Sequence, residues 1–71
     1  MDALLVDDSA TMRMRLRRLL EATPDMSVTD HGDPVAAMVE ARMRAFDIVL
    51  VDCHMPGIDG IAFIRQMRTI P

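Results

Sequence analysis

The sequence predicts an α/β fold with a parallel sheet, and three observations support this prediction. Continuous apolar runs at residues 3–6 and 48–51 are typical of strands covered on both faces, as parallel strands are. Segments with helical spacing of apolar residues separate the strands, and polar turn or cap residues mark the junctions. Alternating strands and helices form β-α-β units with right-handed crossovers, so residues 1–71 are expected to form one domain.

The first strand, at residues 3–6, leads into a helix that Ser9 can cap, because a serine hydroxyl there accepts a bond from a first-turn N–H. The helix is expected to end near residues 23–24, where a proline follows a threonine. Its apolar positions recur every three or four residues and predict the buried face; they are Met12, Leu16, Leu19 and Leu20. Its basic residues form a patch that is either a solvated face or a contact for an acidic partner; they are Arg13, Arg15, Arg17 and Arg18.

The second unit combines a weaker strand at residues 26–30, centred on Val28, with a helix at residues 34–44. Asp33 followed by proline is a helix start signal, because the carboxylate caps the first turn and proline fits the first helical position. His31, in the polar connection, is expected to be solvated. The predicted buried stripe of the helix consists of Val35, Met38 and Val39, with Met43 near its edge.

The third unit contains the strand at residues 48–51 and a helix that starts near Gly60, capped by Asp59. Residues 55–58 have the sequence Met-Pro-Gly-Ile, which is typical of a type II turn with glycine at the third position. Gly60 also permits a close approach of another backbone segment. One side of the helix is expected to carry Ile61, Ile64 and Met67.

Length and charge limit the possible functions. A core built from 71 residues rarely supplies more than about 3 to 5 kcal/mol of stability by itself. The net charge of -3 gives no electrostatic reason to expect nucleic acid or an anionic membrane as a partner. Cys53, the only cysteine, is expected to be a small buried apolar residue in a reducing compartment. Asp7 and Asp8 interrupt the first apolar run, so it is neither a signal peptide nor a membrane span, and a cytoplasmic location is the default.

Three acids follow predicted strands: Asp7 and Asp8 follow the first strand, and Asp52 follows the third. Ligands of open parallel sheets lie beyond the carboxyl ends of the strands, so the three carboxylates converge if these strands are neighbours. At about 5 Å and an effective dielectric near 20, each pair of charges repels by about 3 kcal/mol, which favours a raised pKa or a bound cation. Mg2+ suits such oxygen ligands, and a carboxylate beside it can act as a nucleophile towards phosphorus. Asp52 is the candidate nucleophile, and the acidic pair are candidate metal ligands.

The sequences VDDS after the first strand and VLVDCHMPGIDG around the third resemble the receiver domain of two-component response regulators, the CheY-like superfamily. The resemblance spans the whole chain and implies a flavodoxin-like parallel sheet with strand order 2-1-3, the first three of five β-α units. By this resemblance Asp52 is the phosphoacceptor and also a ligand of the Mg2+ site that Asp7 and Asp8 serve, and the backbone carbonyl of His54 completes the metal ligands. The phosphoryl group would come from a sensor histidine kinase or a phosphotransfer protein, and the first helix would form part of the docking surface.

The chain departs from the family pattern after its third unit. The fourth strand with its serine or threonine and the fifth strand with its lysine are missing, and all eight basic residues are arginines. The third strand would then have an unpaired edge, bordered by Val49 and Val51. Such an edge favours a homo-oligomer formed by strand pairing or element exchange, unless the sequence is a fragment of a longer protein.

Other interpretations of the same residues remain open. The chain could be a binding module that docks a kinase or a second receiver without being phosphorylated. The three acids could act only as caps of turns and helices. A turnover enzyme is not expected, because a phosphatase of the haloacid dehalogenase type has a second acid two residues after its nucleophile, where Ser9 or Ala10 stands here.

Overall fold

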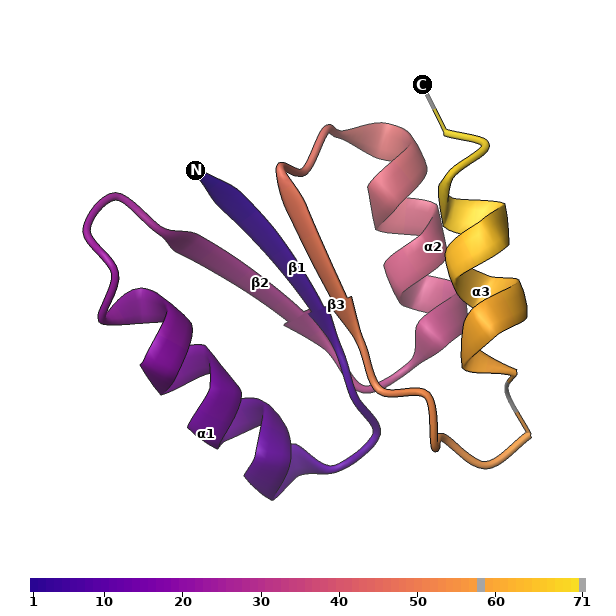
Figure 1. Ribbon diagram of the computed structural model, residues 1–71, viewed down its shortest axis with the longest axis horizontal. Helices are drawn as coiled ribbons and strands as arrows, with labels where there is room; N and C mark the ends of the chain where they lie inside the picture. The colour runs from indigo at the N-terminus through magenta and orange to yellow at the C-terminus, as the bar shows by residue number, and fades with distance from the viewer. Residues whose placement is uncertain (58, 71) are drawn as a thin grey trace.

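The computed structural model describes residues 1–57 and 59–70 and shows three parallel strands with helices on both faces of the sheet (Figure 1). The strands lie in the order β2-β1-β3, which confirms the predicted order 2-1-3. The elements in chain order are β1 (Asp2–Val6), α1 (Ala10–Glu21), β2 (Ser27–His31), α2 (Pro34–Met43), β3 (Ile48–Val51) and α3 (Gly60–Met67). Each predicted strand and helix is therefore present, with ends close to those predicted.

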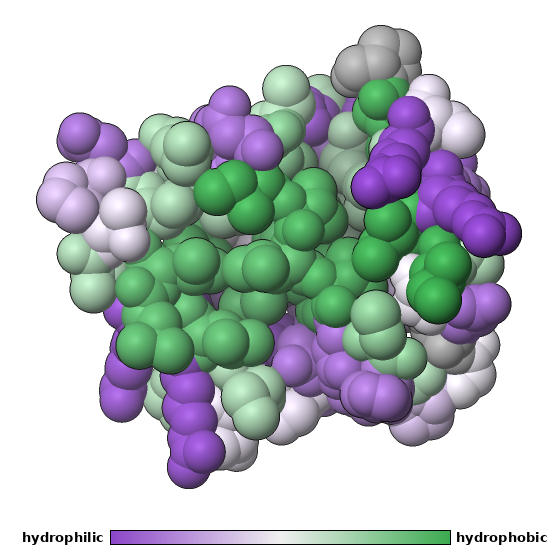
Figure 2. Space-filling view, viewed as in Figure 1, coloured by the Kyte–Doolittle hydropathy of each residue, from purple (hydrophilic) through white to green (hydrophobic). Residues whose placement is uncertain are grey.

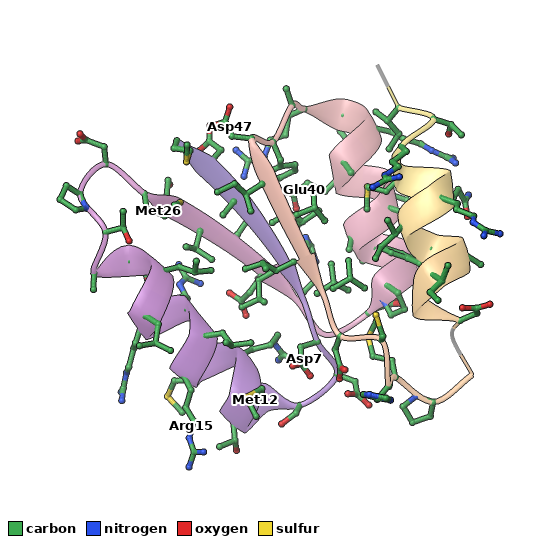
Figure 3. All side chains as sticks on the ribbon, in the orientation of Figure 1. Asp7, Met12, Arg15, Met26, Glu40 and Asp47 are labelled. Carbon is green, nitrogen blue, oxygen red and sulfur yellow. The ribbon has the colours of Figure 1, made fainter. Side chains whose placement is uncertain are left out.

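β1 is the centre of the sheet and pairs with both neighbours. Its last residue, Val6, is the register partner of His31 at the end of β2 and of Val51 at the end of β3. At the other end of the strands, the Asp2 N–H donates to Asp47 Oδ2 over 2.7 Å and the Asp47 N–H donates to the Asp2 carbonyl over 2.8 Å (Figure 3 labels Asp47). These bonds fix the relative position of β1 and β3, so the residues that follow the two strands emerge side by side.

Successive residues of β1 point to opposite faces, so the sheet carries two apolar clusters. The cluster between the sheet and the α2–α3 pair consists of Leu4, Val6, Ala37, Met38, Ala41, Met55 and Phe63. The cluster on the α1 side consists of Ala3, Leu5 and Val28, with Leu16, Leu20, Met26 and Ile48 packed against it at partial exposure. Because α1 contributes no fully buried residue, its face of the sheet is covered less completely than the other.

The predicted buried stripes of the helices are only partly correct. Leu16 and Leu20 of α1 contact the apolar cluster as predicted, whereas Leu19 is 70% exposed. The other exposed side chains on predicted apolar stripes are Met12, Val35, Val39, Met43 and Ile61. In α2 the buried residues are Ala37 and Ala41 together with the predicted Met38. Small side chains at a contact let a helix axis lie close to its neighbour, so the alanines rather than the valines face the sheet.

The predicted caps of the three helices are confirmed. Ser9 Oγ accepts from the Met12 N–H over 3.2 Å at the start of α1. Asp33 and Asp59 each use Oδ1 to accept, over 3.0 Å, from the N–H two residues later, at the starts of α2 and α3. Within the part of the chain that the structure describes, none of these helices is long and apolar enough to cross a membrane.

The loop between β3 and α3 contains the Pro-Gly turn. Gly57 has a φ of 73°, in the left-handed region that the third position of a type II turn requires. Ile58, the fourth residue of the predicted turn, lies outside the described residues. Gly60 lies against the backbone of Cys53, because a Cβ on residue 60 would be 2.6 Å from Cys53 Cα. The predicted close approach is confirmed, and a larger residue there would push α3 away from the loop.

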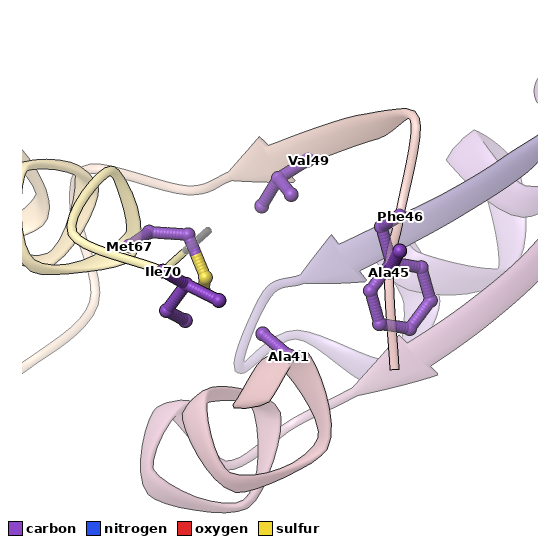
Figure 4. A pocket seen from close by; sticks show the side chains of 6 residues that line it. All are labelled: Ala41, Ala45, Phe46, Val49, Met67 and Ile70. Carbon is purple, nitrogen blue, oxygen red and sulfur yellow. The ribbon is translucent and has the colours of Figure 1, made fainter. Parts of the chain in front are cut away.

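β3 is an edge of the sheet, and among the described residues no strand pairs with its outer side. Val49 and Val51 are half-buried, whereas Leu50 is 38% exposed. Figure 2 shows apolar side chains gathered in the part of the view where Figure 1 draws the strands. A cavity of about 110 Å³ lies next to β3 and is lined by Ala41, Ala45, Phe46, Val49, Met67 and Ile70 (Figure 4). β3 is therefore an edge strand within the part of the chain that the structure describes.

Candidate functional site

The candidate site lies at the carboxyl ends of β1 and β3. The Asp7 N–H donates to the His31 carbonyl over 3.1 Å, which ties the end of β1 to the end of β2. The Asp52 N–H donates to the Val6 carbonyl over 2.9 Å, which ties the end of β3 to β1. Both acids therefore continue the ladder of the sheet, and their main chains are fixed by it. Figure 3 labels Asp7 at the end of β1, beside the loop that leaves β3.

The three predicted acids meet at this edge. Asp7, Asp8 and Asp52 each offer a carboxylate oxygen, and these oxygens all lie within 4.8 Å of one another. Asp7 is 4% exposed, Asp52 is half-buried and Asp8 is exposed, so the cluster runs from the interior to the solvent. The predicted convergence is therefore confirmed, and it follows from the adjacency of β1 and β3.

Two of the carboxylates are held by the backbone in the same way. Asp7 Oδ1 accepts from the Ser9 N–H over 2.9 Å, and Asp52 Oδ1 accepts from the His54 N–H over 2.9 Å. In each case the donor is two residues after the acid, which is the local bond that aspartate forms in turns. Among the described residues, neither acid has a hydrogen bond to Oδ2. One oxygen of each carboxylate orients the group, and the other can bind a ligand.

The chemistry of these ligands fits a hard divalent cation. With the carboxylates this close, an effective dielectric of about 20 gives a repulsion of about 3 kcal/mol for each ionised pair, and less where solvent screens Asp8. A cation among the oxygens offsets this repulsion. Mg2+ binds to one or two carboxylates and keeps several waters, which suits a cluster that is open to solvent at Asp8 and closed at Asp7.

Arg13 of α1 also reaches the site, a contact that the residue pattern does not predict. Its Nη1 donates to the Asp7 carbonyl over 2.7 Å, and its Nε donates to Asp30 Oδ2 over 3.2 Å. Arg17 Nη1 donates to Asp30 Oδ1 over 2.5 Å, and the hydrogen bonds that Arg17 donates, first to Glu21 and then to Asp30, raise the pKa of Arg17. Two arginines of the predicted basic patch are thus bound within the chain. The signal available in the sequence is an arginine at the fourth position of a helix that begins two residues after Asp8.

Two predictions concern the loop after Asp52: the burial of Cys53, which is wrong, and a metal contact of the His54 carbonyl. Cys53 is exposed, not buried, because it lies beyond the end of β3 in the loop that leads to α3. His54 is also exposed, and its backbone N–H is bound to Asp52. The proposed contribution of its backbone carbonyl to metal binding stays a prediction.

The predicted solvation of His31 is wrong, since this residue ends β2 and is half-buried. Its Nε2 lies 2.6 Å from Glu40 Oε1 of α2, and Arg44 Nε donates to Glu40 Oε2 over 3.1 Å. The hydrogen bond from His31, and to a smaller extent the bond from Arg44, holds the pKa of Glu40 below its usual 4.5. These side chains attach α2 to the end of β2, next to the strand that carries Asp7.

Comparison with known proteins gives a consistent result. The sequence matches the response regulator receiver domain over residues 3–71. It is 36% identical over 72 residues to the cyclic di-GMP phosphodiesterase response regulator RpfG of Xanthomonas campestris pv. campestris. This match covers 100% of the present chain and 19% of RpfG. It is 40% identical over 72 residues to protein-glutamate methylesterase/protein-glutamine glutaminase 3 of Rhodopseudomonas palustris. This match covers 96% of the present chain and 20% of the methylesterase.

The fold has a solved counterpart as well. The crystal structure of the response regulator domain of Thermotoga maritima CheB superposes with a TM-score of 0.85 at 32% identity, over 99% of this chain and 53% of that chain. The chain therefore spans about a fifth of the curated relatives named above and about half of the solved domain.

Proposed function

Because this chain belongs to the response regulator receiver domain family, we propose that it accepts a phosphoryl group on Asp52 from a phosphohistidine. The donor would be a sensor histidine kinase or a phosphotransfer protein, and the chain would correspond to the first three β-α units of a receiver. The observation that carries the proposal is the convergence of Asp7, Asp8 and Asp52 within 4.8 Å at the carboxyl edge of the sheet. We also propose a cytoplasmic location, because a lone exposed cysteine fits a reducing compartment.

Asp52 is the nucleophile in this proposal. Its free carboxylate oxygen attacks phosphorus and forms an O–P bond, while the P–N bond of the donor breaks and its electron pair stays on the imidazole nitrogen. The bonds from the His54 N–H to Asp52 Oδ1 and from the Asp52 N–H to the Val6 carbonyl hold the acid before the reaction. A nucleophile fixed in this way needs little reorientation when the donor docks.

The acidic pair would hold Mg2+ in this proposal. Asp7, Asp8 and Asp52, whose carboxylate oxygens lie within 4.8 Å of one another, would be the side-chain ligands, and the backbone carbonyl of His54 would be a further ligand. When bound, Mg2+ supplies positive charge that offsets the carboxylates and the phosphoryl oxygens. The buried Asp7 lies on the interior side of the site, and the exposed Asp8 lies on the solvent side, from which the donor would approach.

The test is the mass of the intact chain after incubation with Mg2+ and acetyl phosphate, a small phosphodonor. We expect one added phosphoryl group in the wild type and none in Asp52→Asn. Asp25→Asn is the matched control, because Asp25 is an exposed residue with a φ of 63°, a conformation that asparagine also adopts readily. An adduct that persists in Asp52→Asn, or no adduct in the wild type, would contradict the proposal.

A second candidate function is a binding module that associates with another chain without being phosphorylated. The open outer edge of β3 and the 38% exposure of Leu50 favour this candidate, because an uncovered apolar strand edge can pair with a second copy. The oligomeric state from light scattering and the phosphoryl adduct from the mass measurement together distinguish the two functions. A dimer that forms no adduct supports the binding module, whereas a monomer that gains one phosphoryl group excludes it.

A further inference from the structure

Arg13 is held at two points, one directly after β1 and one in β2. Its Nη1 donates to the carbonyl of Asp7, the residue after β1, and its Nε donates to the carboxylate of Asp30 in β2. The Arg13 side chain is 22% exposed, so most of it is enclosed between α1 and the strand ends. In the described residues, its hydrogen bonds involve a backbone carbonyl and Asp30, and none goes to a carboxylate of the acidic cluster.

The Arg13 guanidinium lies so close to Gly32 that a larger residue at position 32 would contact it. A Cβ on Gly32, directly after β2, would lie 2.6 Å from Arg13 Nη1 and 3.2 Å from its Cζ. Gly32 does not have a positive φ, in contrast to Gly57, so its backbone conformation does not require glycine. Its small size therefore leaves room for Arg13, independently of the hydrogen bonds that Arg13 forms.

The bond to Asp7 acts on the peptide that links the two neighbouring acids. The Asp7 N–H is bound to the His31 carbonyl, and the Asp7 carbonyl is bound to Arg13 Nη1. With both ends of the residue fixed, the peptide between Asp7 and Asp8 cannot rotate freely, and the direction of both side chains follows from it. Without Arg13, the carbonyl of this peptide would lose the guanidinium donor that holds it.

We propose that Arg13 is a positioning residue for the metal site: it clamps the Asp7 carbonyl and so keeps the Asp7 and Asp8 carboxylates directed at the ligand they share with Asp52. The inference rests on the proposed function for the identity of that ligand, a divalent cation. Arg13 touches neither the metal nor the phosphoryl group, and it acts through the main chain of Asp7.

The test is the Mg2+ affinity of the unphosphorylated chain, measured by titration calorimetry because the chain has no tryptophan or tyrosine. Arg13→Gln removes the clamp and one positive charge. We expect its dissociation constant for Mg2+ to rise about tenfold, the lower end of what residues behind metal ligands contribute. Arg15→Gln removes the same charge from an exposed side chain of the same helix, labelled in Figure 3, and serves as the control.

The direction of the change in Mg2+ affinity on Arg13→Gln distinguishes a positioning role from a purely electrostatic one. Removal of a positive charge near a cation site strengthens cation binding if charge alone matters, as Arg15→Gln would report. Weaker binding in Arg13→Gln together with unchanged or slightly tighter binding in Arg15→Gln supports the proposal. Unchanged or tighter binding in a folded Arg13→Gln overturns it.

A second variant covers the case in which Arg13→Gln does not fold, as judged by circular dichroism. Gly32→Ala keeps every charge but displaces the guanidinium, so we expect a Mg2+ dissociation constant several-fold above that of the wild type. An unchanged constant in Gly32→Ala then overturns the proposal. Wild-type chain that binds Mg2+ but gains no phosphoryl group overturns only the proposed function, whereas wild-type chain that binds no Mg2+ overturns both.

Discussion

The two faces of the sheet are held to their helices by different interactions. On the α2–α3 face, side chains such as Leu4, Met38 and Phe63 are buried in one apolar cluster. On the opposite face α1 buries no residue fully, and Arg13 and Arg17 bind it to the sheet through Asp30. The first attachment depends on apolar area removed from water, which salt affects little. The second combines a smaller apolar contact through Leu16 and Leu20 with charge pairs, which salt screens. The α1 face is also the one that reaches the acidic cluster, so the site depends on the more polar attachment.

Truncation of Phe63 is the strongest test of the apolar face. Phe63 is 8% exposed, and Phe63→Ala is expected to cost about 3 to 5 kcal/mol, as for other buried aromatic side chains. This equals what a core of this size supplies, so the variant should be largely unfolded at 25 °C in circular dichroism, at any salt concentration. Leu20→Ala is the counterpart on the α1 face, where the side chain is only partly buried, and a smaller loss is expected. Equal losses for the two variants would remove the contrast between the faces.

Gly60→Ala tests how closely α3 is attached to the loop that follows Asp52. The added Cβ would meet Cys53 Cα at 2.6 Å, and relief of this contact requires a backbone shift that costs about 1 to 3 kcal/mol. Gly57→Ala is the matched control, because its Cβ meets nothing within 4 Å but its φ of 73° costs about 1 kcal/mol in alanine. Urea unfolding compares them, and a smaller loss in Gly60→Ala than in Gly57→Ala would contradict the close contact.

Asp30→Asn tests the polar attachment of α1. Asp30 binds Arg13 over 3.2 Å and Arg17 over 2.5 Å at 24% exposure, so loss of its charge is expected to cost about 1 to 2 kcal/mol at low salt. The difference from the wild type should shrink in about 1 M NaCl, where the Debye length is about 3 Å. Urea unfolding at low and high salt measures both values, with the exposed Asp25→Asn as the control. A loss that does not change with salt would show that the attachment is not electrostatic.

Glu40→Gln is expected to have the smallest effect on stability of these variants, and it tests the polar contact between α2 and β2. Its pKa in the folded chain lies below the usual 4.5, first because of His31 and then because of Arg44. Ionised Glu40 therefore stabilises the fold above this value, and the contribution is lost as the pH falls through the lowered pKa. Glu40→Gln should be less stable than the wild type at neutral pH and should converge with it in acid. Urea midpoints as a function of pH measure this, and parallel curves would contradict the prediction.

The strands, the caps and the meeting of the three acids could be predicted because their signals are local. Apolar runs define β1 and β3, and Ser9, Asp33 and Asp59 stand directly before their helices. The convergence of the acids then needs only the adjacency of two strands.

The inward side of α2 and the contact of Arg13 could not be predicted in this way. Spacing alone selects the most apolar stripe, whereas the observed stripe contains Ala37 and Ala41, whose small size suits close packing on a narrow sheet. The end of a long arginine side chain is placed by groups far apart in sequence, here Asp7 and Asp30. Neither position is encoded by a repeat that periodicity can detect.

The exposed Cys53 has a practical consequence. The chain has one cysteine and no tryptophan or tyrosine, so this thiol is its single selective attachment point for a spectroscopic probe. The thiol stands one residue after Asp52 and next to Gly60, in the loop between β3 and α3. The rate at which a thiol reagent modifies Cys53 can therefore report on events at the neighbouring carboxylate, in a protein that has no tryptophan or tyrosine fluorescence.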